Sequence, residues 1–188
     1  KGQVVDAAMV DGASVLMSMF YAFKASGFWL EERESNMLDG GAHFYDTYEC
    51  SDGKFLAVGA IEPQFYSVLL EKLEISDEKF KNQHDRNQWP DLKEIIKGKI
   101  KEKTRDEWAN IFDGTDACVG PVLNLSEAPK HSHMNARNVF IDIDGTIQPA
   151  PAPRFSETVS KIKHSALKAG ENNDEICAEY NLDRSCFS

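Results

Sequence analysis

The chain has 188 residues, of which 41% are hydrophobic and 28% are charged, a composition typical of one large globular domain or two small ones. Its formal net charge of −10 argues against a surface for nucleic acid or anionic lipid, because such surfaces need clustered Lys and Arg. No run of 18 or more apolar residues is present, so the sequence predicts no membrane-spanning helix.

The first 35 residues predict a short strand followed by a long apolar helix. Residues 3–5, QVV, favour a strand, and Asp6 is placed to cap the helix that follows. Gly27 is a typical C-terminal stop for this helix. Because the helix is apolar on most of its faces, we expect it to be buried.

The next segment predicts a hairpin that leads directly into a helix. The Gly40–Gly41 pair permits tight backbone turns, and residues 44–49 alternate like a strand. Residues 51–53, SDG, are a hairpin turn signal before a returning strand at 54–60. Pro63 fits the first position of the following helix, in which apolar residues recur at helical spacing.

Two further helices are predicted in the middle of the chain. Trp89–Pro90 opens the first, after a polar connection at 77–88. Thr104 and Glu107 have the spacing of a capping box at the start of the second. Residues 117–125 predict a buried extended segment.

The last third of the chain predicts a hairpin and a short helix. Residues 140–149 form the hairpin, with an Asp-Gly turn at 144–145. The proline-rich stretch 149–157 is typical of an extended connector, and 173–182 predicts a terminal helix.

The spacing of cysteine and histidine residues does not favour disulfide or metal chemistry. His131 and His133 could offer two metal ligands, but a third ligand at useful spacing is missing and a polar loop is favoured. Residues 142–145 resemble the start of a calcium loop, although a hairpin turn accounts for them fully. The cysteines are far apart and are interpreted as free thiols in a reducing compartment. They are Cys50, Cys118, Cys177 and Cys186.

Glu62 stands between the strand at 54–60 and the helix that begins at Pro63. Glutamate caps helices less well than Ser, Asp or Asn. In one interpretation it is an imperfect, solvated cap. In the other, the rigid strand and helix aim a carboxylate that could hold and polarise a histidine for proton transfer. The pattern alone leaves both interpretations open.

Four motifs carry a resemblance to a known family. They are GQVVDAAMVDG at 2–12, NMLDGGAHFYDTY at 36–48, DGKFLAVGAIEPQFY at 52–66 and EWANIFDGTDACVGPVL at 107–123. They resemble the C-terminal half of the α-methylacyl-CoA racemases, which belong to the family III CoA-transferase superfamily. The resemblance is close over residues 1–123 and patchier afterwards.

The resemblance implies a small sheet-plus-helix domain flanked by pieces of a larger α/β domain, in an interlocked homodimer. It assigns residues 1–35 to the large domain, 36–125 to the small domain with its linkers, and 126–188 to a segment returning to the large domain. The implied reaction is racemisation of (R)- and (S)-2-methylacyl-CoA thioesters by removal and return of the α-proton. The family needs no metal or other cofactor, CoA being part of the substrate, and its members act in mitochondria and peroxisomes.

The resemblance also implies which side chains take part. The family uses an aspartate and a histidine that is paired with a glutamate, and Glu62 matches that glutamate. An apolar surface for the acyl chain is implied at four positions, for which the alternative is a place in the core. These positions are Met9, Leu38, Tyr45 and Ile61.

The family motifs that hold the histidine and the aspartate do not occur in this sequence. His43 is no substitute, because it occupies the proline position of the family motif. We therefore expect the chain to be a fragment that is inactive alone. The alternatives are a CoA-transferase of the same superfamily and a non-catalytic dimerisation fragment. Glu62 favours the racemase, because the transferases do not generally keep a glutamate at that turn.

Overall fold

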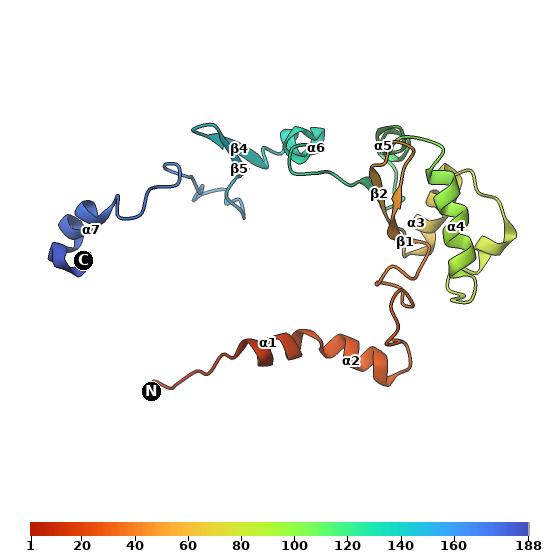
Figure 1. Cartoon of the computed structure of the whole chain (residues 1–188), viewed down its shortest axis with the longest axis horizontal. Helices are drawn as coiled ribbons and strands as arrows, with labels where there is room; N and C mark the ends of the chain where they lie inside the picture. Colours follow the sequence, from red (N-terminus) through yellow and green to blue (C-terminus); the bar gives the residue numbers. More distant parts are fainter. Residues whose placement is uncertain (188) are drawn as a thin grey trace. The chain divides into compact units, whose positions relative to one another are not determined.

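The computed structural model describes residues 1–187, and the chain divides into two compact units. Unit 1 is Lys1–Val122, and unit 2 begins at Leu123. The mixture of short sheets and helices confirms the predicted α/β class (Figure 1). The division into segments 1–35, 36–125 and 126–188 stays a prediction.

Unit 1 contains one small sheet. Its helices are α1 (Met9–Leu16), α2 (Ser18–Ala25), α3 (Pro63–Lys72), α4 (Trp89–Ile100) and α5 (Arg105–Phe112), with a 3-10 turn η1 (Glu78–Lys81). Its strands are β1 (Tyr45–Glu49), β2 (Phe55–Gly59) and β3 (Val119–Pro121). All strand pairs are antiparallel, and β2 is central.

Helices α3, α4 and α5 cover one face of this sheet only (Figure 1). Side chains alternate between the two faces of a strand. Tyr48, Leu56 and Val58 therefore share the covered face, where they are buried. The helices meet them with apolar side chains from α3, α4 and α5, and these are Tyr66, Leu69, Leu92, Ile96, Ile100, Trp108 and Phe112. The opposite face of the sheet is left open.

Local turn and cap chemistry explains most of the element boundaries in unit 1. Gly53 adopts a φ of +75° in the β1–β2 turn, a conformation that glycine tolerates best. Pro63 is at the start of α3, as predicted. The predicted capping box is present before α5, because Thr104 and Glu107 satisfy each other's backbone amides. These features confirm the hairpin and both helix starts.

The N-terminal segment differs from the prediction. Residues 3–5 form no strand, and Ala8 rather than Asp6 precedes α1, without a side-chain cap. The expected single helix breaks at Met17 into α1 and α2, and neither helix has a buried residue. The predicted burial is therefore wrong for the described chain, because an apolar helix is buried only where another segment covers it.

Two other predictions need correction. The polar connection at 77–88 is not simply a solvent-exposed linker, because Phe80 on η1 and Gln83 after it are buried. The segment 117–125 is mostly half-exposed or exposed instead of buried. Its strand β3 lies at the edge of the sheet, which also explains how it tolerates Pro121.

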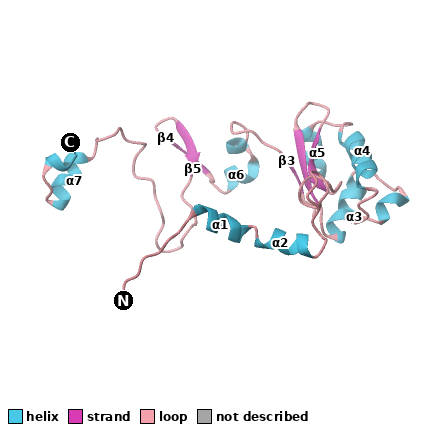
Figure 2. Cartoon of the chain, turned by 60° about the horizontal axis from the view of Figure 1, so that its bottom comes forward, coloured by secondary structure: helices cyan, strands magenta, loops and turns pink. Residues whose placement is uncertain are grey.

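Unit 2 consists of short elements joined by long loops (Figure 2). They are η2 (Ala128–Lys130), α6 (Ser132–Ala136), β4 (Phe140–Ile143), β5 (Thr146–Pro149), α7 (Asn173–Tyr180) and η3 (Arg184–Phe187). Strands β4 and β5 pair antiparallel, and the turn residues Asp144 and Gly145 both have positive φ. The predicted hairpin and terminal helix are confirmed. Among residues 1–187, no helix is long and apolar enough to cross a membrane.

The core of unit 1 encloses an unusual polar group, the imidazole of His43. The ring is fully buried, and its Nε2 lies 2.7 Å from the Tyr66 hydroxyl. Because Tyr66 donates its only proton to the Phe80 carbonyl, Nε2 acts as the donor of His43. The unprotonated Nδ1 has no partner among the described residues. Burial, with a smaller contribution from His84, lowers the pKa of His43 to about 4.

We expect the stability of unit 1 to fall between pH 6.5 and about 4. In this range the unfolded chain binds a proton at His43 and the folded chain does not, so acid favours unfolding. The free energy of unfolding should fall by up to about 1.4 kcal/mol per pH unit from this group. Urea unfolding of the wild type and of His43→Leu measures it, with exposed His164→Leu as the control. Equal pH slopes in all three proteins would contradict the prediction.

We also expect the chain to self-associate in isolation. Apolar side chains gather on α1 and α2 without cover, and a surface of this kind promotes association. The exposed ones are Met9, Val10, Val15, Leu16, Met17, Met19 and Tyr21. Light scattering over a range of concentrations measures the particle mass, and a monodisperse monomer at all of them would count against this expectation.

Candidate functional site

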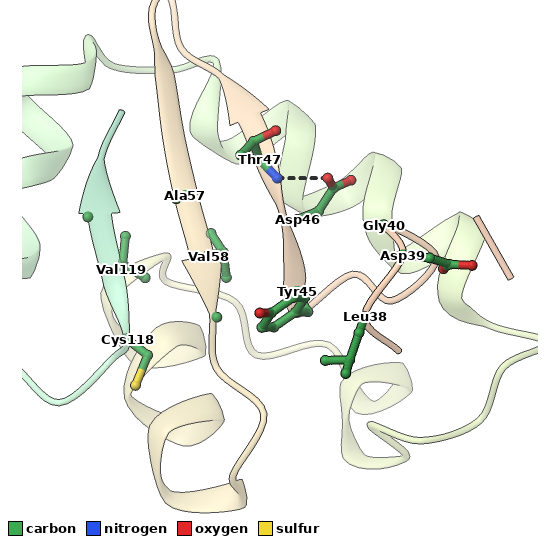
Figure 3. A pocket seen from close by; sticks show the side chains of 12 residues that line it. Leu38, Asp39, Gly40, Tyr45, Asp46, Thr47, Ala57, Val58, Cys118 and Val119 are labelled. Atoms are coloured by element: carbon green, nitrogen blue, oxygen red, sulfur yellow. Dashed lines mark hydrogen bonds between the residues drawn. The ribbon is translucent and has the colours of Figure 1, made fainter. Parts of the chain in front are cut away.

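The open face of the sheet carries a pocket of about 650 Å³. Its floor comes from β1, β2 and β3, and one wall comes from the loop that precedes β1 (Figure 3). The lining residues are Leu38, Asp39, Gly40, Tyr45, Asp46, Thr47, Ala57, Val58, Gly59, Cys118, Val119 and Gly120.

The floor is shaped by the pairing of large and small side chains across β1 and β2. Tyr45 lies opposite Gly59, and Thr47 lies opposite Ala57. A Cβ atom at Gly59 would lie 3.7 Å from the Tyr45 ring, an ordinary van der Waals contact, so the ring packs beside the glycine. The small side chains on the floor leave space above the sheet, and the tyrosine provides an apolar wall.

The loop wall is held by a buried amide and a carboxylate. The side chain of Asn36 donates to and accepts from the backbone of Leu30, at 2.9 and 2.8 Å. Asp39 accepts from the Asn36 amide nitrogens and from the Gly41 backbone nitrogen. Burial raises the pKa of Asp39, but these hydrogen bonds outweigh it and hold the pKa below its ordinary value. The loop is therefore braced independently of any ligand.

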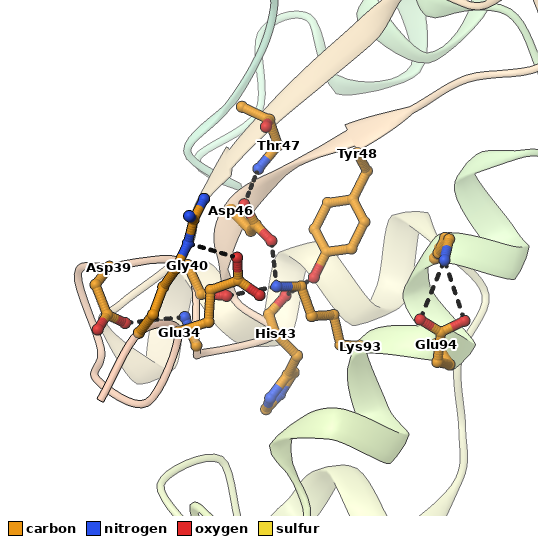
Figure 4. Close-up of polar contacts among 12 residues, drawn as sticks. Glu34, Asp39, Gly40, His43, Asp46, Thr47, Tyr48, Lys93 and Glu94 are labelled. Carbon is orange, nitrogen blue, oxygen red and sulfur yellow. Dashed lines mark hydrogen bonds and ion pairs between the residues drawn. The ribbon is translucent and has the colours of Figure 1, made fainter. Parts of the chain in front are cut away.

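Lys93 on α4 joins the loop wall to the floor (Figure 4). Its ammonium group lies 2.5 Å from an Asp46 carboxylate oxygen and also donates to the Gly40 carbonyl oxygen. The other carboxylate oxygen of Asp46 accepts from the Thr47 backbone nitrogen at 2.7 Å. Both charged side chains are about three-quarters buried, so this contact is screened less than a surface ion pair.

Glu62 is the N-cap of α3, and its side chain makes no capping hydrogen bond. Its backbone is extended, with φ −74° and ψ 142°, as expected for a residue before proline. The side chain is exposed, and its carboxylate is close enough to act on the thiol of Cys118, which lines the pocket. Burial raises the pKa of Cys118, and the charges of Glu62 and Asp116 raise it further.

The five residues singled out from the sequence do not all gather at the pocket. Leu38 and Tyr45 line it, and Glu62 lies beside its Cys118 end. Ile61 is half-buried against the core and is not among the lining residues. Met9 on α1 is 90% exposed and belongs neither to the pocket nor to the core, so its alternative interpretation as a core residue is wrong. The catalytic and binding roles themselves stay predictions.

Sequence reasoning missed the residues that hold the pocket and its neighbourhood together. Lys93, Asp46 and Gln83 act through partners that lie 22 to 53 residues away in the chain. Lys93 and Asp46 gave one signal in the sequence, because each interrupts an apolar pattern, whereas Gln83 lies in a polar run that gave none.

The described residues include three free thiols and no cluster suited to a metal ion. Cys50, Cys118 and Cys177 are free thiols, as predicted, whereas the side chain of Cys186 lies outside the described part of the chain. Within residues 1–187, no group of three His, Cys, Asp or Glu side chains is arranged to hold a metal ion.

The fold is that of an α/β protein with known structural relatives. A crystal structure of a CAIB/BAIF family protein from Brucella suis is similar, with a TM-score of 0.67 and 25% identity. The match covers 95% of this chain and 48% of that one. Residues 1–173 match the sequence model of the CoA-transferase family III. The chain therefore belongs to the CoA-transferase family III.

Within that family, the chain is similar to proteins described as alpha-methylacyl-CoA racemase. It is 42% identical to the one from Homo sapiens and 43% identical to the one from Mus musculus, each over 187 residues. Both matches cover 98% of this chain but only 49% of the relative. The chain thus spans about half the length of these curated relatives.

We expect Gly41→Ala to disrupt the loop wall, while Gly120→Ala is tolerated. A Cβ at Gly41 would lie 2.7 Å from the Glu34 carbonyl oxygen and 2.8 Å from that of Asn36, so the backbone must shift. At Gly120 nothing lies within 4 Å. Gly41→Ala should lower the free energy of unfolding by about 1–3 kcal/mol, as overpacking does. Denaturant titration compares the two variants, and a Gly41→Ala midpoint equal to that of Gly120→Ala would refute the steric argument.

Proposed function

We propose that the full-length protein containing this chain interconverts (R)- and (S)-2-methylacyl-CoA thioesters. The observation that carries the proposal is the identity of 42–43% with alpha-methylacyl-CoA racemases over nearly the whole chain. In this proposal the chain supplies Glu62 and the neighbouring pocket, and the rest of the protein supplies the other reacting groups.

The proposed chemistry begins with removal of the α-proton. The α-carbon of a thioester is a weak acid, so the base must be well placed and the enolate oxygen must be stabilised. A histidine from outside the chain takes the proton, and its second ring nitrogen donates to the Glu62 carboxylate. This contact fixes the tautomer and stabilises the imidazolium that forms. An aspartic acid then returns a proton to the opposite face of the α-carbon, which inverts the configuration.

The position of Glu62 supports this role. A side chain that acted only as a helix cap would bond to the first amides of α3, and Glu62 makes no such bond. The carboxylate is exposed and therefore accessible to a group from another segment or subunit. A junction between a strand and a helix also gives it a fixed origin.

The pocket supports binding of the acyl chain. Its floor of Ala57, Gly59 and Gly120 is small and apolar, and Leu38 and Tyr45 provide larger apolar surfaces. These residues do not provide cations for the CoA phosphates. We therefore propose that the CoA portion lies against another part of the full-length protein, and that Ile61 and Met9 contact the acyl chain only in that assembly.

Three further parts of the proposal come from the family resemblance. The reaction uses no metal or other cofactor beyond the CoA of the substrate. The active enzyme is an interlocked homodimer, in which the exposed faces of α1 and α2 are covered. The protein works in mitochondria or peroxisomes.

A CoA-transferase is the second candidate, because the family as a whole is described by that activity. Acyl transfer in that mechanism uses a carboxylate nucleophile outside this chain. Such a mechanism gives Glu62 no direct role, so the test of Glu62 also separates the two candidates. A non-catalytic dimerisation role remains the third candidate, and it predicts neither activity.

We expect Glu62→Gln in the full-length protein to slow α-proton exchange by about ten- to a hundredfold, as loss of support for a general base does. The amide keeps the size of the side chain but removes the charge that stabilises the imidazolium. Exchange of a 2-methylacyl-CoA in heavy water, followed by NMR or mass spectrometry, measures the rate. KM should change by less than about twofold, because the substrate does not contact Glu62 directly.

Glu71→Gln is the matched control. Glu71 lies on the same helix, is mostly exposed and pairs with Lys72. Its replacement should leave the exchange rate unchanged. Wild-type exchange in Glu62→Gln would return Glu62 to the interpretation of an imperfect cap, and CoA transfer without exchange in the wild type would favour the second candidate.

A further inference from the structure

We infer that Gln83 is a positioning residue for Glu62, an inference that rests on the proposed function. Gln83 lies in the connection between η1 and α4, and its side chain is 7% exposed. Its amide nitrogen donates to the carbonyl oxygens of Ala60 at 3.1 Å and of Ile61 at 2.9 Å. These are the two residues that directly precede Glu62.

Every carbonyl of the junction at 60–62 is thereby engaged. Gln83 holds the first two, and the third, from Glu62, accepts from the backbone nitrogen of Tyr66 at 2.9 Å. On the donor side, the Ala60 nitrogen donates to the Phe44 carbonyl oxygen at 2.9 Å. The backbone that carries the Glu62 side chain is therefore fixed from three directions.

Gln83 itself is held rigidly. Its backbone carbonyl accepts from the indole nitrogen of Trp89 at 2.8 Å, and that indole is buried. The Trp89 ring packs edge-on against Phe44, the residue whose carbonyl also binds the junction. The contact thus links the first turn of α4 to the start of α3 through the core.

This bracing matters because the Glu62 side chain has no capping bond of its own. The direction of its carboxylate depends on the backbone and on the rotamers the backbone allows. A small displacement of a group that orients a general base reduces the rate much more than it reduces binding. Loss of the Gln83 amide should therefore act on turnover through Glu62.

The test compares Gln83→Met in the full-length protein with the wild type. Methionine keeps the approximate volume and apolar stem but cannot donate to the two carbonyls. The kcat for α-proton exchange should fall about tenfold, with KM changed less than about twofold. In the Glu62→Gln background, Gln83→Met should cause no further fall, because coupled residues are not additive. An equal fall in both backgrounds would overturn the inference.

Gln88→Met is the matched control. Gln88 lies in the same connection, but its amide donates to the half-buried Asp85 carboxylate at 2.7 Å and does not contact the junction. This variant should keep the wild-type kcat. A loss in Gln88→Met equal to that in Gln83→Met would mean that the connection as a whole, rather than the amide of Gln83, is responsible.

A structural measurement separates this inference from the proposed function. Hydrogen exchange at the Ala60 and Tyr66 amides should be about tenfold faster in Gln83→Met than in Gln88→Met, because local opening becomes easier. Unchanged exchange there overturns the inference even if racemisation is observed. Faster amide hydrogen exchange in Gln83→Met, in a protein whose activity does not depend on Glu62, overturns the proposed function but leaves the structural role of Gln83 intact.

If Gln83→Met does not fold, Gln83→Asn replaces it, because asparagine keeps the amide and shortens its reach by one methylene group.

Discussion

The asymmetry of the three-stranded sheet governs the rest of unit 1. Helices cover one face, and the alternation of side chains along β2 sends Leu56 and Val58 into that core. The same alternation leaves Ala57 and Gly59 on the other face, where they form the floor of the pocket. One register thus determines both stability and the site, since a shift by one residue would exchange the two sets.

The junction between β2 and α3 carries Glu62, the side chain for which a catalytic role is proposed. Ala60 directly follows β2, which ends at Gly59, and α3 begins three residues later at Pro63. Only a short segment remains to orient Glu62, and such a segment would be mobile unless its backbone were bonded elsewhere. The Gln83 amide supplies those bonds from a connection that is close in space but distant in sequence. Lys93 likewise braces the loop wall of the pocket, because its ammonium group contacts both the Gly40 carbonyl oxygen and the Asp46 carboxylate.

The sequence predicted the features that depend on neighbours along the chain. The β1–β2 turn, the start of α3 at Pro63, and the capping box of Thr104 with Glu107 all follow from local chemistry. The family resemblance led to five residues, of which two, Leu38 and Tyr45, line the pocket. The other three are Glu62, Met9 and Ile61. The failures have a common cause. The burial of the helix at 7–27, the strand at 3–5 and the roles of Gln83 and Lys93 depend on partners that no local pattern specifies.

His43 illustrates how a substitution can be absorbed in a family member. At a position where the family resemblance leads one to expect proline, this chain buries an imidazole and satisfies one of its nitrogens with Tyr66. Its low pKa keeps the ring neutral near pH 7, so no uncompensated charge enters the core. Tyr66 lies on α3 one turn after Glu62, and its backbone nitrogen closes the first hydrogen bond of that helix. The His43 imidazole therefore supports the first turn of α3, which follows Glu62, from the covered side of the sheet. His43 is not among the residues that line the pocket. Helix α3 thus contributes both to the core, through Tyr66, and to the position of Glu62 at its start. We therefore expect substitutions in the core behind this helix to change the direction of the Glu62 side chain.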